Sequence, residues 1–72
     1  MTGKPELPNT TYDIMRAMGK EADFLYETID TYIKDAQDAN KSELAEIWQT
    51  IKKDSLKHLN MLKEALEKEL HG

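Results

Sequence analysis

Apolar residues recur at alternating steps of three and four along two proline-free stretches, and this spacing decides what the chain can fold into. In the first stretch the series is Met15, Met18, Ala22, Leu25, Ile29, Tyr32 and Ala36. The second stretch carries a comparable apolar stripe between Leu44 and Leu66. Steps of three and four place side chains on one face of an α-helix. The sequence therefore predicts two long amphipathic helices.

The only internal turn signal lies at residues 38–42, between the two stretches. Asn40, with Glu43 three residues later, resembles a capping box in which Asn replaces Ser or Thr. Two long helices joined by so short a turn must lie antiparallel. We therefore expect residues 10–72 to form an all-α helical hairpin, with helices at about 10–39 and 41–70.

The first helix is expected to follow a flexible N-terminal segment, residues 1–9, which contains two prolines and few apolar side chains. Thr10, with Asp13 in the first turn, has the pattern of a helix N-cap. Gly19 costs about 1 kcal/mol relative to alanine inside a helix, and it could instead end a short first helix and give three helices. The apolar series runs through Gly19 without a change of phase, which favours one continuous helix.

Composition narrows the choice of partners. A chain of 72 residues lies near the lower limit for folding around one core, and without cysteine it has no disulfide to support that core. The net charge of −4 is mixed along the chain, which argues against a nucleic-acid partner. No apolar run approaches the roughly 20 residues that span a bilayer, and the first residues lack the apolar region of a signal peptide. We therefore expect a cytoplasmic protein that does not bind a membrane.

Three polar residues interrupt the apolar stripes and are therefore expected to point toward the core: Glu21 on the first helix, and Asp54 and His58 on the second. If the turn centres on Asn40, residues that face each other have numbers that sum to about 80. Glu21 and His58 should therefore lie level with each other across the two helices. Leu56 alone points away from the stripe, as single exposed leucines commonly do.

The apolar stripe of the second helix is wider than one partner helix can cover. Two hairpins related by a two-fold axis would close a four-helix bundle and bury the rest of the stripe. We therefore expect a homodimer in which methionine and aromatic side chains serve as packing.

Glu21 and the segments 42–48 and 54–62 give residues 21–66 a resemblance to half of a ferritin-like, rubrerythrin-type four-helix bundle. In that family one helix carries an inward Glu and the next carries Glu-x-x-His, and two such sets hold a di-iron or di-manganese centre. Glu21 matches the inward Glu, and His58 matches the motif's His. The motif's Glu belongs at position 55, where this chain has Ser55. Asp54, one residue earlier, is the candidate replacement.

Two functions follow from these residues, and hydrolase or kinase machinery is not among them, because the sequence has no phosphate loop, cysteine nucleophile or serine triad. The interpretation that we favour is a non-catalytic, self-associating bundle or binding module, in which a buried polar cluster fixes register and dimer geometry. The alternative is a metal-binding protein in which Glu21, Asp54 and His58 hold iron, manganese or zinc. Such a degenerate di-iron-type site would act in iron handling or oxidoreduction.

Overall fold

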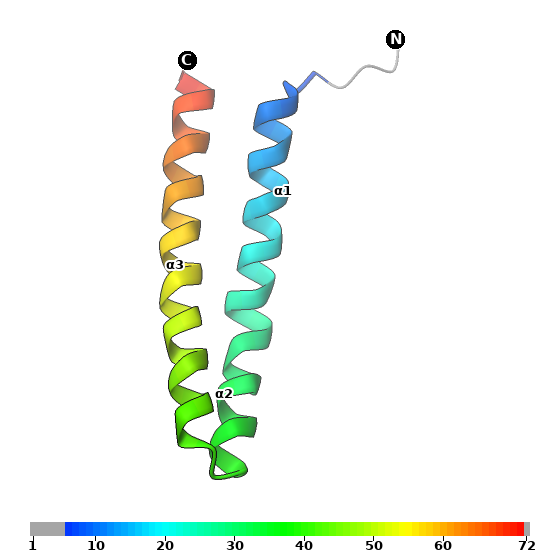
Figure 1. The fold of residues 1–72 in the computed structure, drawn as a ribbon. Helices are drawn as coiled ribbons and strands as arrows, with labels where there is room; N and C mark the ends of the chain where they lie inside the picture. The colour runs from blue at the N-terminus through cyan, green and yellow to red at the C-terminus, as the bar shows by residue number, and fades with distance from the viewer. Residues whose placement is uncertain (1–5, 72) are drawn as a thin grey trace.

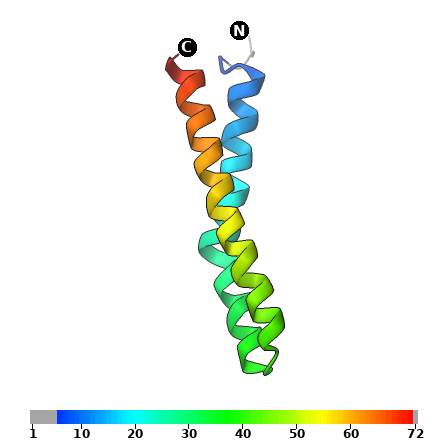
Figure 2. The ribbon, with the colours of Figure 1, turned by 60° about the vertical axis from the view of Figure 1, so that its left-hand side comes forward.

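The protein is a helical hairpin (Figure 1). The computed structural model describes residues 6–71, which contain no strand. The first arm consists of α1 (Asn9–Asp23), the π-helical turn η1 (Phe24–Thr28) and α2 (Ile29–Asp38), and the second arm is α3 (Ser42–His71). The arms run antiparallel and cross at a shallow angle (Figure 2), so the start of α1 and the end of α3 lie at the same end. The predicted all-α hairpin is confirmed.

The hairpin is long and thin. Its principal extents are 56 × 23 × 12 Å and its radius of gyration is 16.5 Å, against about 11 Å for a compact domain of this length. A thickness of 12 Å is that of a single layer of helices. The two arms therefore cover each other along one seam only, and each broad side of the hairpin stays open.

The turn is a Schellman motif that ends α2. Asn40 has a φ of 60°, in the left-handed region that asparagine tolerates better than most residues. Its N–H donates to the carbonyl of Gln37 at 3.0 Å, and the N–H of Lys41 donates to the carbonyl of Ala36 at 2.8 Å. The predicted capping box is therefore wrong: Asn40 closes α2, and α3 begins two residues later, at Ser42.

The first helix begins one residue before the expected position and without a side-chain cap. The N-cap position is Pro8, whose carbonyl accepts the N–H of Tyr12 at 3.0 Å. Thr10 lies inside α1, and its hydroxyl donates to Glu69 of α3 instead. The N-cap prediction for Thr10 is therefore wrong. Of the predicted N-terminal segment, residues 1–5 lie outside the described residues.

Gly19 does not interrupt the first arm, because α1 runs through it to Asp23. The irregularity comes later, at η1, where the N–H of Ile29 donates to the carbonyl of Phe24, five residues earlier. The backbone of Thr28 departs from the usual helical geometry here, with a φ of −114°. A π turn holds one residue more than an α turn. It therefore allows Leu25, Ile29 and Ile33, spaced four and four, to face the same seam.

The core is small and lies around η1 and α2. Its buried cluster consists of Leu25, Ile29 and Ile33, of which Ile29 is completely covered. Partly buried apolar side chains surround the cluster: Phe24, Trp48, Ile51 and Leu59. Only two further apolar residues within the described range are buried, Ala36 and Ala45. A core of five buried apolar side chains is modest for a chain of this length.

One register holds from the turn to the chain ends. The contacts between the arms pair Tyr32 with Trp48, Asp30 with Lys52, Glu21 with His58, and Thr11 with Glu69. The residue numbers in each pair sum to about 80, as expected for two antiparallel helices with the same rise per residue. This register positions the candidate site.

Candidate functional site

Glu21 and His58 form a polar pair between the two arms, near the middle of the hairpin. The distance between His58 Nδ1 and Glu21 Oε1 is 3.0 Å. An ionised carboxylate only accepts hydrogen bonds, so the imidazole must carry a proton on Nδ1 to make this contact. In a neutral ring Nε2 is then left with its lone pair free. The predicted level placement of Glu21 and His58 is confirmed.

The pair lies at the edge of the seam rather than inside it. The side chain of His58 is 54% exposed and that of Glu21 is 23% exposed. Both line a shallow hollow of about 400 Å³ together with Met61, Leu62 and Ala65. The expectation that His58 points into the core is therefore wrong for a single hairpin. The physical reason is the width of the apolar stripe on α3, which extends well beyond the surface that the first arm covers.

Asp54 does not join the pair. It is exposed on α3, one helical turn closer to the hairpin turn than His58. Within residues 6–71, no group of three or more His, Cys, Asp or Glu side chains is arranged to hold a metal ion. A single hairpin thus brings together two of the three predicted ligands, Glu21 and His58.

The polar pair belongs to a broad, mostly apolar surface that we call the His58 face. On α3, steps of three and four place seven side chains on it: Leu44, Ile47, Ile51, Asp54, His58, Met61 and Ala65. The first arm contributes Ile14, Ala17, Glu21, Phe24, Thr28, Tyr32 and Asp35. Ile47 is 54% exposed and Met61 is 59% exposed. Large apolar side chains are thus open to solvent on both sides of the polar pair.

Tyrosine and tryptophan side chains form the end of this face near the turn. The ring of Tyr32 contacts Trp48 at a centroid distance of 5.0 Å and meets the edge of Phe24 at 6.2 Å. Tyr32, Trp48 and Leu44 line a second hollow, of about 300 Å³. Such edge and tilted contacts stabilise aromatic pairs beyond their buried area. The aromatic contacts therefore stabilise this end of the face.

The opposite side of the hairpin has a second apolar patch, which was not predicted from the sequence. Leu56, Tyr26 and Met18 line a hollow of about 440 Å³ beside Gly19. Leu56 is therefore not an isolated exposed leucine. The sum of about 80 for residues that face each other would have predicted this patch, because it places Leu56 level with residues 22–26 of the first arm.

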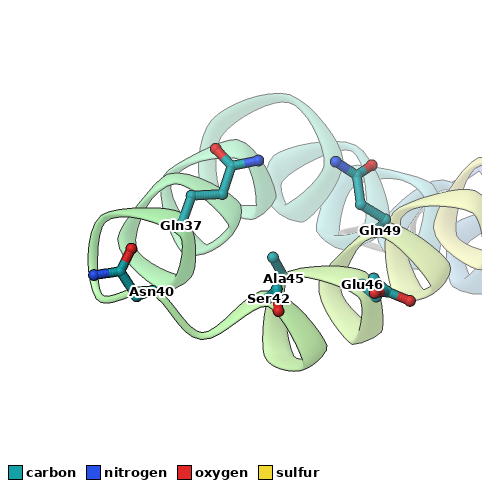
Figure 3. Close-up of a pocket in the computed structure, with 6 residues that line it drawn as sticks. All are labelled: Gln37, Asn40, Ser42, Ala45, Glu46 and Gln49. Carbon is teal, nitrogen blue, oxygen red and sulfur yellow. The ribbon is translucent and has the colours of Figure 1, made fainter.

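A fourth hollow lies at the turn, between α2 and the start of α3 (Figure 3). Its lining side chains are Gln37, Asn40, Ser42, Ala45, Glu46 and Gln49. Among these residues Glu46 is the only one that ionises. Amides and a single carboxylate do not suggest acid–base or nucleophilic chemistry at this place.

The ends of the arms are joined by a cluster that the sequence analysis also missed. The hydroxyls of Thr10 and Thr11 donate to Glu69 Oε1 at 2.6 Å and 3.0 Å. These two hydrogen bonds, that from Thr10 first, lower the pKa of the Glu69 carboxyl below its ordinary value of 4.5. The register would have revealed the cluster, because Thr11 and Glu69 are as level as Glu21 and His58.

Comparison of the chain with protein-family models, curated proteins and solved structures finds no match. The resemblance to ferritin-like bundles thus depends on the residues of this chain alone. Among residues 6–71, no helix has the length and apolar character needed to cross a membrane.

Proposed function

We propose that the protein is a non-catalytic, self-associating helical module, in which two copies pair through the His58 face to form a four-helix bundle. The observation that carries this proposal is the contrast between a one-layer hairpin with five buried apolar side chains and a face of large exposed ones. Helices with so wide an apolar stripe are stable when a second layer covers them.

The size of the face supports a second copy as the partner. The broad side of the hairpin measures 56 × 23 Å. The area of this side therefore exceeds the roughly 800 Å² per partner that a standard interface buries. A second hairpin has the same length and presents the same stripe. Two-fold pairing of identical faces is also the commonest way in which soluble proteins associate.

In this proposal the Glu21–His58 pair selects the partner and its alignment. Covering the face would remove the pair from water, and a polar group buried in a helical interface is tolerated only where it meets another polar group. Neighbouring apolar residues such as Met61 and Ile51 would accept many alignments. The polar pair would permit only a few of these alignments.

Matched lysine substitutions on the two sides of the hairpin test the proposal. Ile47→Lys places a charge on the His58 face, and Leu56→Lys places one on the opposite side; both native side chains are exposed. Native mass spectrometry is expected to show monomers for Ile47→Lys and dimers for Leu56→Lys. Equal fractions of dimer in the two variants would overturn the assignment of the face. A monomeric wild type would overturn self-association itself.

The alternative is a metal-binding module, which the chemistry of the same pair favours. An imidazole that donates its Nδ1 proton to a carboxylate presents Nε2 to a metal, as metal-binding histidines commonly do. Two copies would supply two imidazoles and the carboxylates of Glu21 and Asp54, which suit iron, manganese or zinc. A degenerate di-iron-type site of this kind would serve iron handling or oxidoreduction.

Metal analysis separates the two functions. If the module binds metal, the wild-type dimer offered Fe(II), Mn(II) or Zn(II) retains it in a fixed ratio, and His58→Ala loses it. A wild-type dimer that stays metal-free at all three would exclude the alternative and leave the self-associating module standing.

A further inference from the structure

Covering the His58 face would remove the side chain of Asp54 from water. Asp54 lies on that face between Ile51 and His58, and it is exposed in the hairpin. None of the ion pairs found in residues 6–71 includes it. A covering layer that offered Asp54 only apolar atoms would bury an unpaired carboxylate, which is strongly unfavourable. The orientation of the second copy must therefore give Asp54 a polar partner.

Two hairpins can face each other about a two-fold axis in two ways. If the axis runs along the hairpin, the two turns lie at the same end, and α3 of one copy faces the first arm of the other at the same level. The register places Asp54 near residues 24–28 of that arm. This arrangement sets the carboxylate between Phe24 and Thr28 of the partner subunit, which offer one hydroxyl and no positive charge, and His58 remains with glutamates only.

If the axis runs across the hairpin, the turns lie at opposite ends, and the two α3 helices face each other antiparallel. The centre of α3 (Ser42–His71) lies between residues 56 and 57. Asp54 and His58 stand almost symmetrically about that point. With the arms fully overlapped, Asp54 is therefore level with His58 of the partner subunit, and His58 with Asp54 of the partner subunit.

The apolar residues of the face fit this second arrangement as well. Counting from the same centre, Ile51 comes level with Met61 of the partner subunit, and Ile47 comes level with Ala65 of the partner subunit. A large side chain thus meets a small one near the ends of the interface, as interdigitating helices require. Among the residues of α3 from Ile47 to Ala65 on this face, polar residues coincide with polar residues and apolar residues with apolar ones.

We infer that the two copies pair about an axis perpendicular to the hairpin, with Asp54 of each chain paired to His58 of the partner subunit. This inference rests on the proposed self-association and adds its orientation. Each His58 then lies between two carboxylates, Glu21 of its own chain and Asp54 of the other, and as an imidazolium it donates from Nδ1 to the first and from Nε2 to the second. Complementary charges that meet in only one alignment fix the register of an interface.

Subunit mixing tests the cross-chain pair. A chain carrying Asp54→Ala keeps His58, a chain carrying His58→Ala keeps Asp54, and neither contains both members of the pair. A homodimer of either variant therefore lacks both cross-chain pairs, whereas the heterodimer retains one. When equal amounts are mixed, native mass spectrometry is expected to find heterodimer well above the half that random assortment gives. A heterodimer fraction of one half or less would overturn the inference.

A distance measurement tests the orientation independently. The chain has no cysteine, so Ser42→Cys, at an exposed site beside the turn, takes a single spin label. Labels at opposite ends of the dimer would be about 40 Å apart, from a rise of about 1.5 Å per residue. With the turns together they would be about 20 Å apart, from two layers of helices. The inference requires the longer distance and is overturned by the shorter one, whereas absence of any dimer overturns self-association as well.

Discussion

His58 of α3 and Glu21 of α1 meet at 3.0 Å between two arms that have no other side-chain hydrogen bond at that level. The pair is separated by 37 positions in the chain, and the position of one turn brings it together. It is also the point at which a single hairpin and a dimer differ most, because it is half-exposed in the first and would be covered in the second.

Glu21→Gln should therefore destabilise the dimer more than the single hairpin. At protein concentrations below the dissociation constant, the free energy of unfolding should fall by less than about 1 kcal/mol, as for an exposed ion pair. At concentrations above the dissociation constant, the free energy of unfolding should fall by more than about 1 kcal/mol, because the interface removes the pair from water. Urea unfolding at the two concentrations measures both values, with Glu27→Gln, an exposed glutamate of η1, as the control. Equal losses at both concentrations would contradict this expectation.

Ser55 is expected to accept alanine and reject glutamate. Its side chain lies in the seam, level with Leu25, and the residue is only 4% exposed. A carboxylate there would be buried among apolar side chains, so Ser55→Glu should lower the free energy of unfolding by more than about 2 kcal/mol. Ser55→Ala should change it by less than about 1 kcal/mol. Equal stability of the two variants in thermal unfolding would show that position 55 does not face the seam.

Removing one residue from η1 should leave the hairpin intact. Without Glu27 the buried residues Leu25, Ile29 and Ile33 would be three and four apart, which suits an uninterrupted α-helix. We expect circular dichroism and urea unfolding to change little, by about 1 kcal/mol or less. Deleting Lys20 from regular α1 is the control, since it rotates all preceding residues by about 100° and separates Thr11 from Glu69. A Glu27 deletion as harmful as the Lys20 deletion would show that η1 is required for folding.

Glu69 should make stability depend on pH at the acidic end. The hydroxyls of Thr10 and Thr11 lower the pKa of Glu69 in the folded hairpin. The contribution of Glu69 to the free energy of unfolding is therefore complete above the ordinary pKa of 4.5, and it is lost as the pH falls through the lowered pKa. Thr10→Val should be less stable than wild type at neutral pH, and the difference should shrink as Glu69 becomes protonated. Urea unfolding of the wild type and of Thr10→Val from neutral to acidic pH measures this difference, with Thr31→Val as the control. A difference that is the same at all pH values would show that the hydroxyl acts through packing.

The sequence was sufficient for the parts of this structure that depend on helical periodicity. The hairpin and the meeting of Glu21 with His58 both follow from two apolar series and one turn, because antiparallel helices keep a constant register. The same register also brings Thr11 level with Glu69, but the capping preference of Thr10 offered a local explanation for that end of the helix.

The remaining differences have local physical causes. Asparagine favours both the start of a helix and the left-handed residue that ends one, so the role of Asn40 required the backbone. The π turn was hidden because Tyr32 and Ile33 are both apolar, and either one continues the series. The exposure of His58 was missed because an apolar stripe does not show which part of it the partner helix covers.

Sedimentation equilibrium of the wild-type chain tests the central claim most directly. The chain has a mass of 8.3 kDa. We expect a concentration-dependent equilibrium whose larger species has twice that mass, and we expect Ile47→Lys to abolish it. A wild-type chain that sediments as a folded species of 8.3 kDa up to millimolar concentration would contradict the claim that the His58 face is a site of self-association.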